Sequence, residues 1–103
     1  MNTHTRKTHW GWQTESQIQI SDTMRLNIVT MKRHTGVLAT TAQASHKDGN
    51  FYSYEPYKDY STQVLHSNPS RCTRQAVEMQ HGRVMNNVDV LVEAVENFYG
   101  VTA

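Results

Sequence analysis

Residues that could bind an anion lie together near position 70, where the sequence predicts the start of a helix. Arg71 and Arg74 would occupy the first helical turn, and Ser70 would cap its N-terminus. Backbone N–H groups at a helix start attract anions, and Thr73 would add a hydroxyl donor. Because arginine can hold a phosphate through two parallel hydrogen bonds, these four residues are predicted to form a ligand-binding site.

The charges of this predicted helix run against its dipole. The basic residues come first and the acidic residues last: Arg71, Arg74 and Arg83, then Asp89, Glu93 and Glu96. A helix dipole favours the opposite order, and a local rule broken without compensation often marks a functional site. The alternative is that Arg71 and Arg74 pair with surface acids such as Glu55 or Asp59, which requires no function.

Aromatic residues are concentrated between residues 51 and 60, which hold four of the five tyrosines. In a strand, Tyr52 and Tyr54 would share one face, where they could stack on a base or contact a partner protein. Cross-strand packing is the alternative, and we favour it for the tyrosines taken alone. If the helix start lies near this strand, however, the tyrosines and arginines could line one nucleotide-binding cleft.

Two tryptophans flank a glycine in Trp10-Gly11-Trp12. We expect these rings to close one end of the core, because large rings dominate burial energetics. The alternative is that one ring is presented to a ligand.

Residues with catalytic potential show no supporting pattern. Cys72 in a first helical turn beside arginines could act as a nucleophile, but no cysteine-hydrolase signature surrounds it, so we favour a small buried hydrophobe. His81 lies on the apolar seam and is expected to be a hydrogen-bonded interface residue. The six histidines lack metal-ligand spacing, and no glycine-rich phosphate loop is present. We therefore expect no catalytic residue, no metal site and no cofactor.

One stretch, residues 70–99, is predicted to be helical. A seven-residue repeat places apolar side chains on one side, and no proline interrupts it. It would form one long helix, or two helices broken at Gly82 or at Asn86-Asn87. The side chains expected to be buried are Val77, Val84, Val88, Leu91, Val95 and Phe98.

Strand patterns occupy the residues before this helix. They cover residues 17–20, 25–32 and 37–45, a fourth strand that begins at Phe51, and residues 62–66. Asp48-Gly49 predicts a two-residue hairpin turn, in which Ser45 opposes Tyr52 and Gln43 opposes Tyr54. Strands followed by a helix indicate an α+β fold, with a four- or five-stranded antiparallel meander sheet packed by the C-terminal helix.

The chain has 103 residues, which predicts one domain over residues 10–103. Residues 1–9, with Arg6 and Lys7 and no acid, are expected to form a flexible basic arm. The formal net charge of +1 does not by itself indicate nucleic acid, and no apolar run could span a bilayer. A single cysteine is typical of a cytoplasmic protein. A small polar chain with an apolar helix face is also expected to form a homo-oligomer.

These observations favour a non-enzymatic protein that captures a phosphorylated small molecule, such as a nucleotide or cyclic nucleotide signal, by sequestration. One alternative is a protein–protein inhibitor or adaptor, similar to phage-encoded inhibitors in size and style only. Another is single-stranded nucleic-acid binding on the sheet, where tyrosines would stack on bases and Lys32 and Arg33 would contact the backbone.

Overall fold

Six strands precede two helices in a computed structural model that describes residues 2–48, 53–57, 62–69 and 71–100. The strands are β1 (Asn2–Thr8), β2 (Gly11–Gln19), β3 (Met24–Lys32), β4 (Val37–His46), β5 (Glu55–Pro56) and β6 (Gln63–Pro69). The helices are α1 (Arg74–Met85) and α2 (Val88–Tyr99). The strands form one antiparallel sheet in the order β1-β2-β3-β4-β5, and β6 also pairs with β4. The predicted α+β fold with a meander sheet is therefore confirmed.

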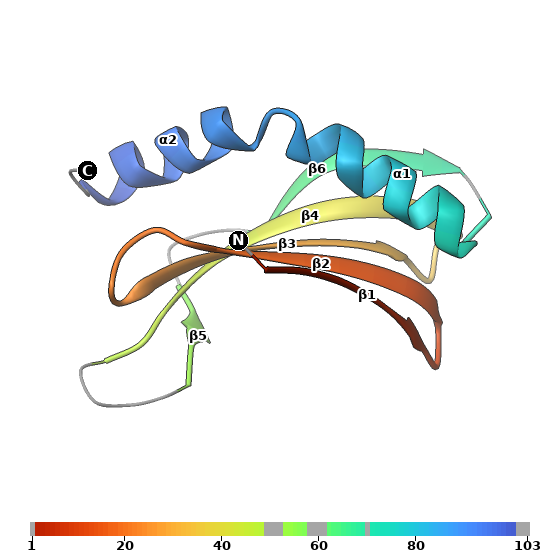
Figure 1. Ribbon diagram of the computed structural model, residues 1–103, viewed down its shortest axis with the longest axis horizontal. Helices are drawn as coiled ribbons and strands as arrows, with labels where there is room; N and C mark the ends of the chain where they lie inside the picture. The colour runs from red at the N-terminus through yellow and green to blue at the C-terminus, as the bar shows by residue number, and fades with distance from the viewer. Residues whose placement is uncertain (1, 49–52, 58–61, 70, 101–103) are drawn as a thin grey trace.

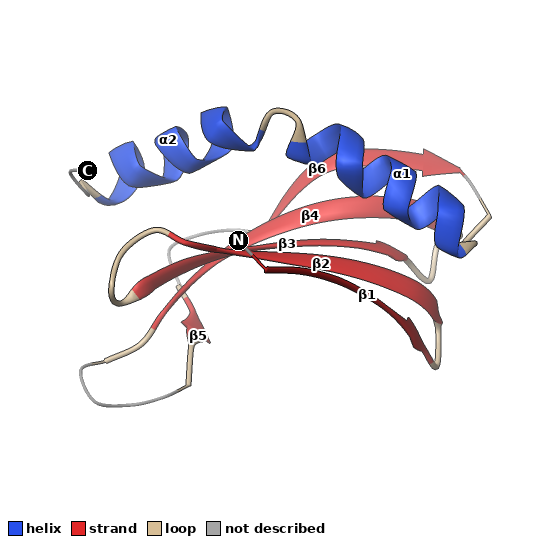
Figure 2. Cartoon of the chain, in the orientation of Figure 1, coloured by secondary structure: helices blue, strands red, loops and turns tan. Residues whose placement is uncertain are grey.

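Both helices lie on the same side of the sheet (Figures 1 and 2). Side chains alternate across a strand, so even-numbered residues of β2, β3 and β4 face the helices and odd-numbered residues face away. The even-numbered Met24, Leu26, Ile28, Ala42 and Ala44 form the apolar core together with Val95 of α2. The opposite face of these strands is left without a helix.

The flexible arm expected at residues 1–9 is instead strand β1. It pairs with β2 from Asn2 opposite Gln17 to Thr8 opposite Gly11. Hydroxyl pairs join the two strands, since the Thr3 and Ser16 oxygens lie 2.8 Å apart and those of Thr5 and Thr14 lie 2.9 Å apart. The basic charge of this segment indicated a flexible arm, but Thr3 and Thr5 favour a strand with such cross-strand pairs.

The predicted hairpin register after β4 was also wrong. Ser45 lies opposite Pro56 rather than Tyr52, and residues 47–54 connect the two strands. Packing of Tyr57 supplies the physical reason. Its ring lies between those of His46 and Tyr99, with centroids 4.4 and 4.3 Å away, and its N–H donates to the Ala44 carbonyl. Gly49 and Tyr52 lie outside the described residues.

The C-terminal stretch forms two helices, as one of the two sequence readings allowed. Asn86 caps the end of α1 and Asn87 precedes α2, so the break falls at these asparagines and Gly82 stays inside α1. The cap at the start of α1 is Thr73, whose hydroxyl accepts a hydrogen bond from the Ala76 N–H.

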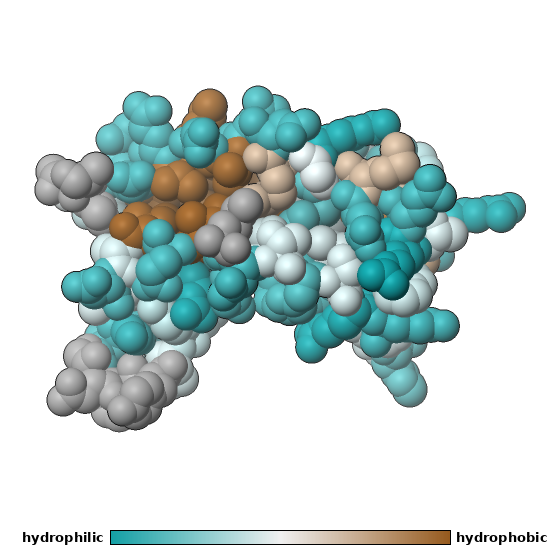
Figure 3. Space-filling view, in the orientation of Figure 1, coloured by the Kyte–Doolittle hydropathy of each residue, from teal (hydrophilic) through white to brown (hydrophobic). Residues whose placement is uncertain are grey.

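Phe98 was expected to be buried, and it is instead 61% exposed. The residues of α2 that contact the core are Val88, Leu91, Val92, Val95 and Tyr99. Val88, Leu91 and Val95 keep the seven-residue spacing, but a straight α-helix drifts from that spacing, so the contact stripe ends on Tyr99 and Phe98 falls beside it. Val77 and Val95 are buried as expected, while Val84, Val88 and Leu91 are partly buried. Apolar side chains gather around α2 in the space-filling view (Figure 3).

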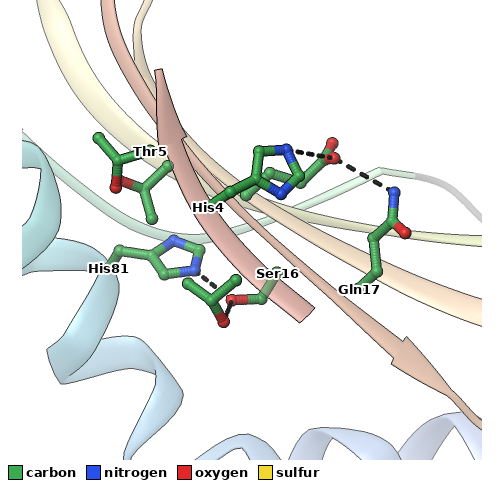
Figure 4. Close-up of polar contacts among 8 residues, drawn as sticks. His4, Thr5, Ser16, Gln17 and His81 are labelled. Carbon is green, nitrogen blue, oxygen red and sulfur yellow. Dashed lines mark hydrogen bonds and ion pairs between the residues drawn. The ribbon is translucent and has the colours of Figure 1, made fainter. Parts of the chain in front are cut away.

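A buried polar layer joins α1 to the sheet (Figure 4). The Nε2 atom of His81 lies 2.7 Å from the Ser16 hydroxyl, and its Nδ1 atom lies 2.8 Å from the Thr30 hydroxyl. Next to it, the Gln80 amide donates to the Leu38 carbonyl and to the Thr40 hydroxyl. His81 is only 2% exposed, and burial lowers its pKa from 6.5 to about 4. The imidazole is therefore neutral near pH 7, with one nitrogen donating and the other accepting.

We expect stability to depend on pH through His81. Its folded pKa lies below its unfolded value, so the unfolded chain takes up this proton first. The stabilisation is complete above pH 6.5 and is lost as the pH falls from 6.5 towards 4. The loss amounts to about 3 kcal/mol at most. The free energy of unfolding, measured with urea at several pH values in this range, should change more steeply with pH in the parent than in His81→Gln. The exposed His66→Gln is the control, and an unchanged slope in His81→Gln would contradict the assignment.

A second prediction concerns α2. Val95 is 1% exposed and Val90 is 70% exposed on the same helix. Val95→Ala should lower the free energy of unfolding by about 2 kcal/mol, because two buried methyl groups are lost and a cavity remains. Val90→Ala should change it by less than about 0.5 kcal/mol. Chemical denaturation of the two variants makes the comparison, and equal losses would show that α2 does not pack on the sheet as described.

Candidate binding groove at one end of the sheet

The helix start holds the residues first considered as an anion site. Arg74 is largely exposed, its Nε donates to Glu78 Oε1 at 2.7 Å, and its guanidinium lies 5.4 Å from the centre of the Trp12 ring. Arg71 is exposed, and Ser70 lies outside the described residues. The ion-pair alternative is thus realised for Arg74, with Glu78 on the next turn as its partner, and Asp59 lies outside the described residues.

Cys72 packs against the start of β2. Its thiol donates to the Trp12 carbonyl at 3.3 Å. Gly11 has a φ of +121°, and a Cβ added there would lie 2.9 Å from the Cys72 sulfur. This close approach is a packing role, in line with the small-hydrophobe reading of the cysteine.

The tyrosine cluster lies elsewhere. The ring of Tyr54 is covered by the Arg25 guanidinium at 3.8 Å, and the Gln19 amide donates to its hydroxyl at 2.8 Å. The Lys47 ammonium is 5.5 Å from the same ring. Tyr52 lies outside the described residues.

Tyr54 and the helix-start arginines do not line a common cleft. Arg74 lies against Trp12 at the start of β2, whereas Tyr54 lies against Gln19 at the end of the same strand. Seven residues of strand separate these two positions, which is roughly 23 Å. The combination of arginines and tyrosines expected from the sequence is therefore not assembled in the described part of the chain.

A groove of about 850 Å³ lies at the end of the sheet that holds the β1–β2 and β3–β4 turns. Its floor is on the uncovered face of the sheet, and its walls come from the β1–β2 turn, the β3–β4 turn and the residue before β6. The lining residues are Trp10, Met31, Lys32, Arg33, His34, Gly36, Ala39, Thr41 and Thr62. A volume of this size suits a small organic ligand.

Trp10 supplies an aromatic wall to the groove. It sits in the β1–β2 turn and is 78% exposed, although the sequence analysis expected it to pack in the core. The backbone N–H of Trp10 donates to the Thr8 hydroxyl, which in turn donates to the Gly11 carbonyl. The turn is thus ordered, and it leaves the large indole ring available for stacking.

Basic residues of the β3–β4 turn border the groove. Lys32, Arg33 and His34 are exposed there, and Lys32, the last residue of β3, pairs with Leu38, which lies on the side of the sheet that the helices cover. Arg33 exchanges backbone hydrogen bonds with the far side of this turn, and Gly36 adopts a φ of +86° that only glycine takes easily. None of the described lining residues is acidic. The groove therefore combines an apolar floor, an indole ring and positive charge, which suits a flat ring that carries an anionic group.

The sequence predicts this groove only if residues 2–8 are assigned as a strand. In a meander, alternate turns lie at the same end of the sheet. The Trp10 turn and the Lys32–Gly36 turn meet for this reason once residues 2–8 are counted as a strand. Without β1, Trp10 had no defined place and was assigned to the core.

Other kinds of site were also considered. No group of three or more histidine, cysteine, aspartate or glutamate residues that could hold a metal ion occurs in the part of the chain that the structure describes. No helix among the described residues is long and apolar enough to cross a bilayer. Comparison with known protein families, with curated proteins and with solved structures found no similar protein.

Proposed function

We propose that this protein is a non-enzymatic binding protein that captures a phosphorylated small molecule with a flat ring, such as a nucleotide, by sequestration. The observation that carries the proposal is that Trp10, Lys32 and Arg33 line the same groove as the apolar Met31 and Ala39. In this arrangement, the base stacks on the indole ring and the phosphate is held by the two cations. Sequestration needs binding groups without a catalytic residue, and the groove offers these.

The charge distribution supports the same reading. The formal net charge is only +1, but the groove wall holds a lysine, an arginine and a histidine in adjacent positions. The three acids Asp89, Glu93 and Glu96 lie on α2. An anion would therefore meet a locally positive region despite the near-neutral total.

The helix start remains a rival location for the phosphate. Arg71, Thr73 and Arg74 are exposed there, and the ion pair between Arg74 and Glu78 is worth only about 0.2–1 kcal/mol, so a ligand could displace it. The two locations can be separated by mutation because they use different cations.

We expect Trp10→Ala and the double variant Lys32→Ala/Arg33→Ala each to weaken nucleotide binding by about tenfold or more, since stacking on one ring is worth about 1–3 kcal/mol. Arg71→Ala/Arg74→Ala is the matched charge control and should bind like the parent. Isothermal titration with adenosine and guanosine mono-, tri- and cyclic phosphates makes the measurement. All changed side chains are exposed, so thermal melts should stay close to that of the parent.

Two results would contradict this proposal. If the arginine double variant alone lost binding, the site would be the helix start. If the parent bound none of these nucleotides at millimolar concentration, capture of a nucleotide would be excluded.

A second candidate function, a protein–protein inhibitor or adaptor, is favoured by the exposed apolar residues of α2. Val90 and Phe98 are both largely exposed, and Met79 of α1 is half exposed. Exposed apolar side chains mark an association surface where they form one contiguous patch. The same surface supports the homo-oligomer expected from the sequence. We also propose a cytoplasmic location, because a single cysteine is typical of reducing compartments.

Association can be tested directly. We expect sedimentation at micromolar concentration to show a species heavier than the 11.8 kDa monomer. Phe98→Ser should shift it towards the monomer, because a large apolar contact is lost, while Arg83→Ser on α1 serves as a surface control. A parent protein that sediments as a monomer would contradict the prediction.

A further inference from the structure

We propose that the groove is one end of a longer track, and that the uncovered face of the sheet binds a single-stranded nucleic acid. The inference rests on the proposed function, because it takes the Trp10 groove as the site of one nucleotide. It adds the class of ligand, an oligonucleotide strand, and a second contact region at the far end of the same face.

The strand register defines this face. Odd-numbered residues of β2, β3 and β4 lie on the side opposite to the core residues and form rows across the sheet. The rows, from the groove outwards, are Gln13-Met31-Ala39, Glu15-Val29-Thr41, Gln17-Asn27-Gln43 and Gln19-Arg25-Ser45. The first row belongs to the groove end and the last row to the Tyr54 cluster. These two ends are six residues of β3 apart, which is roughly 20 Å.

Each end of the face combines an aromatic ring with cations. At the groove end, Trp10 lies near Lys32 and Arg33. At the far end, the Arg25 guanidinium covers the Tyr54 ring at 3.8 Å and the Lys47 ammonium lies 5.5 Å from it. A planar guanidinium held on a ring is preorganised to contact a phosphate or a base. Two such ends separated by this distance are too far apart for one nucleotide and suit a strand of about four nucleotides, near the smallest known single-strand sites.

The middle of the face is lined by carboxamides. Gln17, Asn27 and Gln43 lie side by side on three neighbouring strands. Within the described residues, the buried Asn27 Oδ1 atom has no hydrogen-bond partner. The Gln43 amide donates to the Ala44 carbonyl and accepts from the Thr62 hydroxyl, and the Gln17 amide donates to Glu15. A base edge would exchange with these internal bonds, since carboxamides both donate and accept.

Charge distinguishes this ligand from a peptide. Among the strand residues of β1–β4 that face away from the helices, Glu15 is the only acid, and it lies 3.7 Å from His4. Arg6 and Arg25 share that face, and the cations of the two turns flank it. A polyanion with stackable rings complements such a surface better than a neutral peptide does.

The test measures the affinity of the full-length protein for thymidylate oligonucleotides from one to about eight nucleotides long at about 0.1 M salt. Affinity should rise by about tenfold or more between one and about four nucleotides and then level off. Arg25→Ala and Tyr54→Ala should each weaken binding of the longer strands by about tenfold and leave the mononucleotide unchanged. Arg83→Ala, an exposed arginine on α1, should change neither. Lys47→Ala serves as a further far-end variant if Arg25→Ala fails to fold in a thermal melt.

The outcomes separate the two proposals. If mononucleotides bind but affinity does not rise with length, or if the far-end variants bind strands like the parent, the track is wrong and the groove stands. If neither mononucleotides nor strands bind, both proposals fail. A polyglutamate peptide should not displace the strand at equal charge concentration. If it does, the binding is simple charge attraction, and the proposed single-strand site is wrong.

Discussion

The position of α1 depends on the hydrogen bonds that its buried polar residues make to the sheet. An imidazole removed from water is costly unless both nitrogens find partners. His81 meets this requirement with the hydroxyls of Ser16 and Thr30, which lie on two neighbouring strands. Gln80 extends the contact to β4 through Thr40 and the Leu38 carbonyl. These directional bonds allow one placement of the helix across three strands, whereas apolar packing alone would tolerate sliding.

This docking decides which face of the sheet is available for binding. Two short helices cover only the side on which the even-numbered strand residues lie. The other side carries amides and a few cations that are partly or fully exposed, together with Ala39 and Ser45, which are buried. A sheet with one covered face and one solvated face is common among antiparallel folds. Here it leaves a polar surface flanked by turns that carry aromatic and basic residues.

The meander topology then sorts the turns to opposite ends. The β1–β2 and β3–β4 turns lie at one end, where Trp10, Lys32 and Arg33 line one groove. The β2–β3 turn and the end of β4 lie at the other, where Arg25 and Lys47 surround Tyr54. The candidate ligand groups are therefore far apart in the sequence and are brought together by strand order alone.

The sequence by itself determined the features that repeat over short distances. Alternating residues predicted β3, and Val, Leu and Thr content predicted β4. The apolar repeat predicted the C-terminal helices, and Asn86-Asn87 was one of the two places given for a break. The order of strands before helix was enough for the α+β fold and the meander, because sequential antiparallel strands pair with their neighbours. His81 was also placed correctly on the interface by its position in the repeat.

Only the tertiary structure decided the features that depend on distant partners. Residues 2–8 form a strand because β2 presents Thr14 and Ser16 to their threonines. The register of β5 brings Tyr57 against His46 and Tyr99, a contact between distant segments that the sequence of the connecting turn does not encode. Trp10 is a binding candidate instead of a core residue because the β3–β4 turn lies beside it. In each case the deciding energy comes from contacts between segments far apart in the chain, which local patterns do not encode.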